Sequence, residues 1–134
     1  MNQGDPNSLR LELLLPPRVR AGDPVPIRLR AQNVGQGALD LYLRGRAMTF
    51  DVVIARRSGE GVWQRLEGEI IPAIVHLHPL MPGERLESDT AWDQRTKNGR
   101  RVGPGDYVAT GLLLVEGEPL RTAPKPFTIF KPDD

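Results

Sequence analysis

Hydrophobic and polar residues alternate with a period of two along much of the chain, which is typical of strands that bury one face. The clearest example is the segment 25–31, in which valine, isoleucine, leucine and alanine occupy every second position. Pro26 has no N–H for a strand ladder, so its end of this strand is expected at an edge or a bulge. The segment 107–115 is apolar on both faces and is therefore predicted to be a central strand. Shorter apolar runs predict further strands at 9–15, 39–43, 48–54, 62–66, 71–77, 86–92 and 127–129.

Glycine and proline punctuate these runs. The chain has 14 glycines and 13 prolines in 134 residues, and their spread along the sequence leaves little room for helices. We therefore predict an all-β, antiparallel, immunoglobulin-like β-sandwich of about eight or nine strands with Greek-key connections, with a small closed barrel as the second choice. The domain is predicted to span residues 9–130, between a flexible N-terminus at 1–8 and a tail at 131–134.

Three aromatic residues are predicted to stabilise this sandwich. Tyr107 follows a Pro-Gly turn and opens an alternating run, which is where the tyrosine corner of an immunoglobulin-type domain lies. Trp63 and Trp92 are predicted to fill the space between the two sheets. The alternative for either tryptophan is an exposed indole that stacks on a sugar, as in a carbohydrate-binding module.

Composition and charge exclude several kinds of partner and site. The 18 lysines and arginines are nearly balanced by 17 aspartates and glutamates, so neither nucleic acid nor a membrane is expected as a partner. The chain has no cysteine, which excludes thiol catalysis, disulfides and thiolate metal sites and suits the reducing cytoplasm. The sequence has neither a basic leader nor an apolar run of about 20 residues. The expectation is a cytoplasmic protein that is monomeric in solution.

Candidate catalytic groups are few. None of the three serines lies in the glycine-flanked turn of a nucleophile elbow, and acidic residues such as Glu67 are typical of solvated loops. His76 and His78 lie two apart on a predicted strand, so one face could offer two metal ligands, but no cysteine completes a site. The simpler interpretation places both histidines on the solvent side, opposite Val75 and Leu77. We therefore expect no enzyme activity, no metal and no cofactor.

A cluster of basic residues lies between the predicted strands 86–92 and 107–115. Arg95, Lys97 and Arg100 surround an Asn-Gly pair that suits a tight turn with positive backbone angles. Clustered guanidinium groups can bind phosphate, although nearby aspartates offset their charge. Because loops on a rigid sandwich often carry binding residues, this cluster is a candidate interaction surface.

Short motifs follow one another along the chain: Gly45-Arg46, Phe50 to Ile54, Gly59, Val62-Trp63, Leu80-x-Pro82-Gly83-Glu84, Trp92-Asp93 and Val102-x-Pro104-Gly105-x-Tyr107. Their order and spacing, over about Leu11 to Ile129, resemble the BsuPI-related family of intracellular proteinase inhibitors. The resemblance implies an immunoglobulin-like sandwich that inhibits an intracellular subtilisin-type serine protease.

A substrate-like inhibitor presents an extended loop that is already held in its bound conformation. Pro79, Leu80 and Met81 fit this description, because prolines flank apolar side chains that suit a hydrophobic specificity pocket. The basic cluster is the competing contact, better suited to a protease with an acidic pocket. Two main hypotheses remain open: a proteinase inhibitor that binds through one of these loops, and a protein-binding module of the same fold without inhibitory activity.

Overall fold

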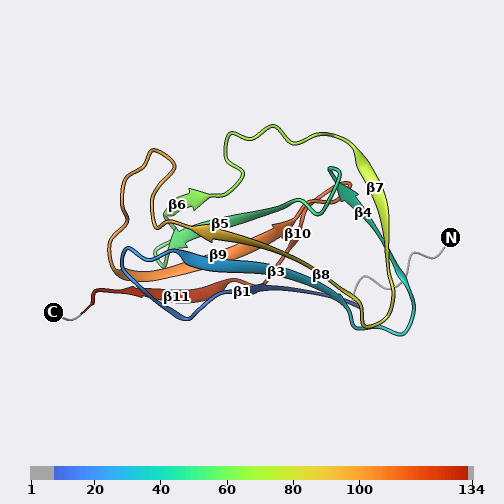
Figure 1. Ribbon diagram of the computed structural model, residues 1–134, viewed down its shortest axis with the longest axis horizontal. Coiled ribbons are helices and arrows are strands. Elements are labelled where there is room, and N and C mark those ends of the chain that lie inside the picture. The colour runs from blue at the N-terminus through green and yellow to red at the C-terminus, as the bar shows by residue number, and fades with distance from the viewer. Residues whose placement is uncertain (1–7, 133–134) are drawn as a thin grey trace.

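The computed structural model describes residues 8–132, so most of the predicted flexible N-terminus and the end of the predicted tail lie outside the described residues. Within this range the chain forms β-strands and no α-helix (Figure 1). The strands are β1 (Leu9–Leu14), β2 (Arg18–Arg20), β3 (Val25–Asn33), β4 (Leu39–Arg44), β5 (Phe50–Arg56), β6 (Gly61–Gln64), β7 (Val75–Leu80), β8 (Arg85–Trp92), β9 (Gly105–Leu113), β10 (Leu120–Arg121) and β11 (Lys125–Phe130).

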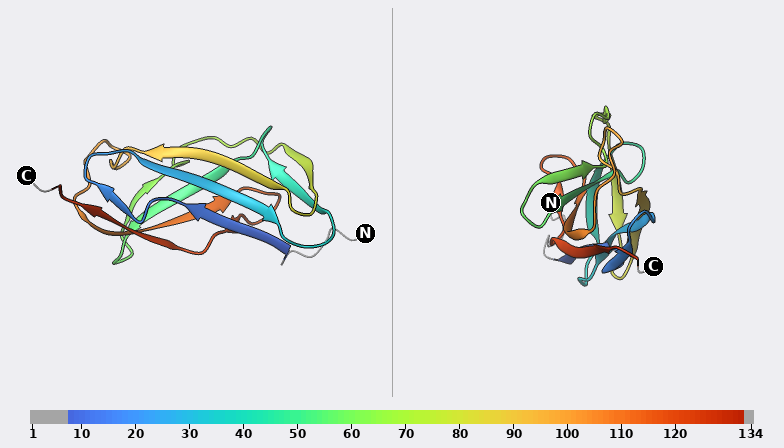
Figure 2. Two further views of the ribbon diagram at one scale, coloured as in Figure 1. Left: turned by 60° about the horizontal axis from the view of Figure 1, so that its bottom comes forward. Right: turned by 90° about the vertical axis from the view of Figure 1, so that its left-hand side faces the viewer.

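The strands form the two layers of an immunoglobulin-like sandwich, which confirms the predicted fold class (Figure 2). One layer is the sheet β1-β3-β8, and the other is the sheet β2-β11-β9-β5-β6, with β10 paired to β9. A two-stranded sheet, β4-β7, lies at one end of the molecule (Figure 1). All strand pairs are antiparallel except β2 with β11. Two prolines, Pro16 and Pro17, end β1 where the chain leaves the first sheet for the second.

The strand pattern agrees with the sequence in its main features. The doubly apolar run forms β9, which pairs with β5, β11 and β10 and so lies inside its sheet. The ladder between β1 and β3 ends where Leu14 pairs with Arg28, so Pro26 lies beyond it on an open side, as predicted. The sequence pattern does not reveal β2 and β10, because strands of three and two residues are too short to show an alternation.

Alternate residues of facing strands build the core between the layers. The buried side chains of β3, β5 and β9 are Val25, Ile27, Leu29, Ala31, Phe50, Val52, Ile54, Tyr107, Ala109 and Leu113. Gly111 marks a close approach of the layers, because a Cβ atom there would lie 3.0 Å from the Cδ1 atoms of both Leu13 and Leu29. A glycine at this position lets the sheets pack without displacing either leucine.

Ion pairs cross the outer face of the β1-β3-β8 sheet. Arg28 Nε donates a hydrogen bond to Asp89 Oδ1 at 2.7 Å, and Arg30 Nε donates to Glu87 Oε2. The hydrogen bond from Arg28 holds the pKa of the Asp89 carboxyl below its ordinary value. The hydrogen bond from Arg30 lowers the pKa of the Glu87 carboxyl in the same way. Solvent screens all these groups, so each pair contributes little to stability.

Acid should remove this contribution. A carboxyl whose pKa is lower in the folded than in the unfolded state stabilises the fold above its ordinary pKa, and the stabilisation is lost as the pH falls through the lowered value. We expect the melting temperature of the wild-type protein to exceed that of a Glu87→Gln, Asp89→Asn variant slightly at neutral pH. The difference should shrink below about pH 4. Thermal denaturation of both proteins across this range measures it, and a difference independent of pH would contradict the prediction.

A buried carboxamide holds the loops at the end of the molecule that carries β4 and β7. Asn33 is fully buried at the end of β3. Its Nδ2 donates to the carbonyl oxygens of Gly37 and Leu80, both at 2.8 Å, and its Oδ1 accepts a hydrogen bond from the Gly35 N–H at 2.9 Å. One side chain therefore joins the loop between β3 and β4 to the end of β7.

Candidate functional site

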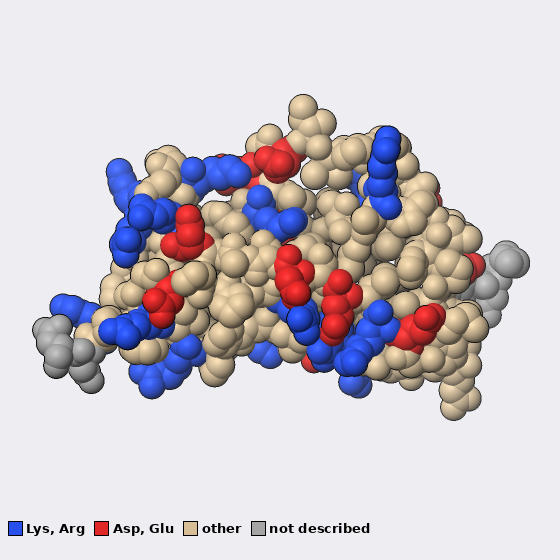
Figure 3. All heavy atoms as spheres, viewed as in Figure 1, with Lys and Arg blue, Asp and Glu red and all other residues tan. Residues whose placement is uncertain are grey.

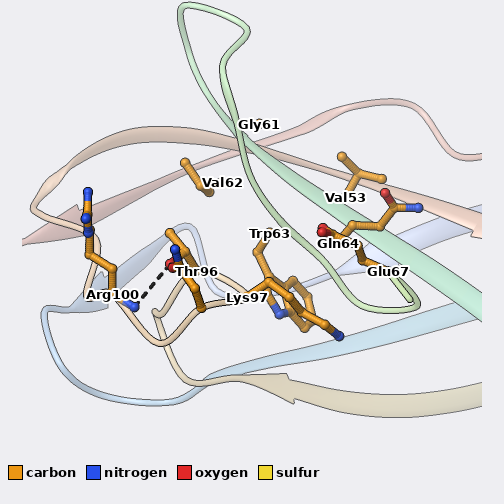
Figure 4. Close-up of a pocket in the computed structure, with 10 residues that line it drawn as sticks. Val53, Gly61, Val62, Trp63, Gln64, Glu67, Thr96, Lys97 and Arg100 are labelled. Atoms are coloured by element: carbon orange, nitrogen blue, oxygen red, sulfur yellow. Dashed lines mark hydrogen bonds between the residues drawn. The ribbon is translucent and has the colours of Figure 1, made fainter. Parts of the chain in front are cut away.

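A groove of about 600 Å³ lies between β6 and the loop that joins β8 to β9, residues 93–104, which we call the basic loop (Figure 4). It is open to solvent and combines an aromatic ring with charged side chains from segments far apart in the sequence. This combination makes it the candidate functional site. Its lining residues are Val53, Gly61, Val62, Trp63, Gln64, Glu67, Thr96, Lys97, Asn98 and Arg100.

The groove has an indole ring at its base. Trp63 pairs with Ile54 across β5 and β6, so its side chain lies on the same face of the sheet as that buried residue. Its ring stacks on Trp92, with centroids 5.9 Å apart and an interplanar angle of 29°. Trp92 in turn meets Tyr107 and Phe127 edge-on. The core therefore fixes the half-buried Trp63 ring, and the remaining exposed part of that ring lines the groove.

The two tryptophans differ in exposure. Trp92 is 1 % exposed and belongs to the core, as predicted, which rules it out as a sugar platform. Trp63 packs against the core but also lines the groove, so the prediction of a purely internal role does not describe it. The reason is its place on β6, the last strand of its sheet, where the space between the layers meets solvent.

Hydrogen bonds within the basic loop give it a defined shape. The Trp92 Nε1–H donates to the Arg95 carbonyl at 2.9 Å, and an isolated bridge joins Arg95 to Arg101. The Thr96 N–H donates to the Arg100 carbonyl at 2.7 Å, and the Arg100 N–H donates to Thr96 Oγ1 at 3.1 Å. The Asn-Gly pair forms the predicted tight turn, with a positive φ at Gly99 alone of the two residues. The loop is thus a small hairpin with an exposed tip.

A second buried carboxamide anchors the start of this loop. Gln94 is fully buried and has a φ of 62°, in the left-handed region. Its Oε1 accepts a hydrogen bond from the Gly22 N–H at 3.0 Å. Its Nε2 donates to the carbonyl oxygens of Arg20 and Asp23 at 2.9 and 2.7 Å. Gln94 therefore joins the basic loop to the turn between β2 and β3. The sequence carries no signal for this, because a glutamine in a polar stretch is ordinarily solvated.

Tyr107 forms the predicted tyrosine corner beneath the other end of the loop. The ring is 1 % exposed, and its hydroxyl donates to the Gly103 carbonyl oxygen at 2.5 Å. The Tyr107 hydroxyl oxygen also accepts a hydrogen bond from Arg56 Nη1 at 3.1 Å. The hydroxyl therefore fixes the point at which the basic loop turns into β9.

Replacing Tyr107 by phenylalanine should cost about 1–2 kcal/mol of unfolding free energy, because the Gly103 carbonyl and the Arg56 guanidinium would each lose a partner. Urea denaturation measures the loss. Tyr42→Phe, on the outer side of β4, is the matched control and should change the unfolding free energy by less than about 0.5 kcal/mol. Equal effects of the two substitutions would mean that the corner hydroxyl is not a stabilising contact.

Of the three residues in the predicted basic cluster, two line the groove and one does not. Lys97 and Arg100 are exposed and line the groove, and no ion pair found within residues 8–132 includes either of them. Arg95 turns back into the loop, where its Nη1 donates to the Gly99 carbonyl at 3.0 Å. Glu67 faces the groove from the side of β6. Lysine and arginine side chains gather over this end of the molecule (Figure 3). The groove thus has one cationic wall and a single carboxylate opposite it.

The prediction that residues 79–81 form an exposed loop is wrong, because the first two of them belong to a strand. Pro79 and Leu80 are the last residues of β7 and pair with Asp40 and Leu39 of β4. Leu80 is 1 % exposed, so its side chain cannot enter a specificity pocket, whereas Met81 is 52 % exposed. Proline is tolerated at 79 because β7 pairs with β4 alone among the described strands. The prolines that suggested a stiff loop instead mark an edge strand.

The predicted orientation of the histidines is also wrong. Leu80 is the buried anchor of β7, and the alternation of the strand therefore turns His76 and His78 towards the partly buried side. Leu77, between them, is 50 % exposed. His76 Nδ1 lies 2.8 Å from the Gly45 carbonyl oxygen. Within residues 8–132, no group of three histidine, aspartate or glutamate side chains is placed to hold a metal ion.

A second groove of about 600 Å³ lies where the chain passes from β1 to β2. Its lining is mostly apolar, and the Arg28–Asp89 ion pair stands at its rim. Lys125 also lines this groove, but no aromatic ring does, so the second groove lacks the combination of two cations and an indole found beside β6.

In the part of the chain that the structure describes, no helix is long and apolar enough to cross a membrane.

No protein-family model matches the chain, and no curated protein matches its sequence. Solved structures match its fold. The alkylpurine DNA glycosylase AlkC of Pseudomonas fluorescens, bound to DNA containing an abasic site analog, aligns with 91% of this chain at 16% identity and a TM-score of 0.50. The β-glucosidase EmGH1 of Erythrobacter marinus aligns with 92% at 13% identity and a TM-score of 0.49. The CARDB domain of the PF1109 protein of Pyrococcus furiosus, in complex with di-metal ions, aligns with 92% at 12% identity and a TM-score of 0.44.

This chain spans 30% of the glycosylase chain, 15% of the glucosidase chain and 86% of the CARDB chain. At these identities the likeness concerns the fold alone.

Proposed function

We propose that this chain is a non-enzymatic protein-binding module and that the groove between β6 and the basic loop is its contact surface. The observation that carries the proposal is a loop with a fixed shape that presents, beside a partly exposed indole, two cations without an ion-pair partner among residues 8–132. Arginine and tryptophan side chains dominate the energetics of many protein interfaces. A loop that is ordered before binding loses little entropy when a partner docks.

The side chains of the groove favour binding over catalysis. They include one carboxylate and no histidine or serine, so they offer neither a pair of carboxylates nor an imidazole for general acid–base catalysis. Lys97 and Arg100 suit the recognition of carboxylates on another protein. We assign the partner to the cytoplasm, because a cysteine-free chain suits a reducing compartment.

Charge reversal in the loop tests the proposal. We expect a Lys97→Glu, Arg100→Glu variant to lose at least about tenfold in affinity for partners that the wild-type protein captures, because like charges then face each other across the interface. Arg10→Glu is the matched control, since Arg10 is exposed on β1 in the other sheet. Quantitative affinity capture with each protein measures the ratio. A set of partners retained equally by all three proteins would overturn the proposal.

A serine protease is the second candidate partner, supported by the resemblance to BsuPI-type inhibitors. The loop tip is a closed turn between Thr96 and Arg100, and a closed turn does not mimic an extended substrate. We therefore expect an inhibitor of this design to cover the protease surface and to remain uncut. Titration of intracellular subtilisin-type proteases should give a stoichiometric loss of hydrolysis with the wild-type protein and with Arg10→Glu, but not with Arg100→Glu. Unchanged hydrolysis across such a panel would remove this candidate.

A further inference from the structure

The groove lies along a strand edge that has no partner. Among the described strands, β6 pairs only with β5. The Arg65 N–H donates to the Val52 carbonyl at 2.9 Å, which continues the β5–β6 ladder. Backbone groups alternate in direction along an antiparallel strand. The N–H group of Gln64 therefore points away from β5, to the side on which the groove lies. The Glu60 carbonyl accepts a hydrogen bond from the Arg56 N–H on β5, so the N–H of the next residue, Gly61, points to the same open side.

On the basis of the proposed function, we infer that the partner supplies an extended acidic segment, which adds to the free edge of β6 as a further strand. Strand addition satisfies backbone groups that water otherwise occupies, and pockets beside the edge select the side chains. In this groove, the cations of the basic loop and the indole of Trp63 would select the side chains of the segment.

Charge complementarity identifies the segment as acidic. Lys97 and Arg100 stand across the groove from β6, and neither is neutralised by an ion pair within residues 8–132. Carboxylates on the segment would form charge-assisted hydrogen bonds with them. Glu67 lies on the β6 side, where the chain turns back with the Glu67 N–H donating to the Gln64 carbonyl. We therefore expect the acidic residues opposite the basic loop and not beside Glu67.

The indole selects a second kind of side chain. Successive residues of an added strand point to opposite faces, so every second one would lie on the face that carries Trp63. An apolar side chain there would cover the exposed part of the Trp63 ring. The other side of that ring stacks on Trp92, with the ring centroids 5.9 Å apart. An alternation of acidic and apolar residues thus matches the groove.

The form of β6 limits how much of the segment can pair. The strand has four residues, and its register with β5 shifts between Ile54 and Ala55. Short and bulged edge strands resist indiscriminate pairing. The backbone contacts alone therefore give a weak complex, and the cations and the indole must supply the rest of the affinity. This division predicts that binding depends steeply on charge.

Peptide binding tests the inference directly. The probes are the acetylated, amidated hexapeptide (Glu-Val)₃, its (Lys-Val)₃ counterpart, and the acidic peptide with alternate amides N-methylated. We expect the acidic probe to bind at least about tenfold more tightly than the other two, because one lacks complementary charge and the other lacks the donors of a strand. In the Lys97→Glu, Arg100→Glu variant the preference should reverse towards the lysine peptide. Titrations of the ¹⁵N-labelled protein measure all the affinities.

Amide hydrogen exchange separates strand addition from simple charge attraction. At saturation with the acidic probe, exchange at Gln64 and Gly61 should slow at least about tenfold, while the exposed amides of the control loop 36–38 keep their rates. Binding without this protection, equal binding of the N-methylated peptide, or a disaccharide probe such as cellobiose perturbing Trp63 while the acidic peptide does not bind would each overturn the inference.

The two proposals fail in different ways. If partner capture depends on Lys97 and Arg100 but the acidic peptide does not bind, the inference is wrong and the binding module stands. If captured partners ignore the charge reversal, the proposed function is wrong, whatever the peptides do.

Discussion

Replacing Leu80 by alanine is expected to lower the unfolding free energy by about 3 kcal/mol, because it removes a fully buried leucine from the core and leaves a cavity. Leu80 is 1 % exposed and ends β7, where its carbonyl oxygen accepts a hydrogen bond from Asn33. Urea denaturation measures the loss. The prediction separates a core residue from an inhibitor contact, which would affect binding and leave stability unchanged.

The neighbouring Met81 is the matched control. It is 52 % exposed, so Met81→Ala should change the unfolding free energy by less than about 0.5 kcal/mol. We also expect the folded fraction of the Leu80→Ala variant to capture partners as the wild-type protein does, because residues 79–81 lie outside the groove. A stable Leu80→Ala variant that loses its partners would restore residues 79–81 as the contact surface.

Replacing Gln94 by alanine should cost about 3 kcal/mol, since it removes a fully buried side chain and leaves three partly buried backbone groups without their partners, each such loss costing about 1 kcal/mol. Those groups are the Gly22 N–H and the carbonyl oxygens of Arg20 and Asp23. The positive φ at Gln94 strains glutamine and alanine alike, so the substitution isolates the loss of the side-chain hydrogen bonds. Urea denaturation gives the free energy, and faster amide exchange at Gly22 should accompany it.

Two further substitutions sharpen this result. Gln36→Ala removes the same side chain from an exposed loop position and should be close to neutral. Gln94→Glu keeps an acceptor for the Gly22 N–H but turns a carboxylate towards two carbonyl oxygens, so it should be at least as destabilising as Gln94→Ala. If Gln94→Ala costs no more than Gln36→Ala, the carboxamide is not the anchor of the basic loop.

The strands and the corner could be predicted because their signals are local. An alternation such as that of 25–31 places one set of side chains inside whatever the rest of the chain does. Tyr107 after a Pro-Gly turn is a similarly local pattern, and the hydrogen bond to Gly103 follows from it. The central position of β9 also followed, since the apolar side chains on its outer face are partly covered by the strands paired on either side of it.

The errors concern contacts between distant segments. Both faces of β7 carry apolar residues, so its alternation fits either orientation, and only the pairing of Leu80 with Leu39 decides between them. Asn33 and Gln94 resemble ordinary loop residues until the carbonyl groups of other loops surround them. The groove likewise needs the hairpin β5–β6 and the basic loop side by side, and nothing in either segment alone indicates the other.

The parallel pairing of β2 with β11 constrains the order in which the strands can assemble during folding. Val19 lies beside Ile129, so a strand formed near the beginning of the chain finds its neighbour only near the other end. Bringing such distant segments together carries a loop-closure cost that earlier contacts must offset. During synthesis, β2 therefore lacks this partner until β11 has left the ribosome, so the second sheet can be completed only after that point.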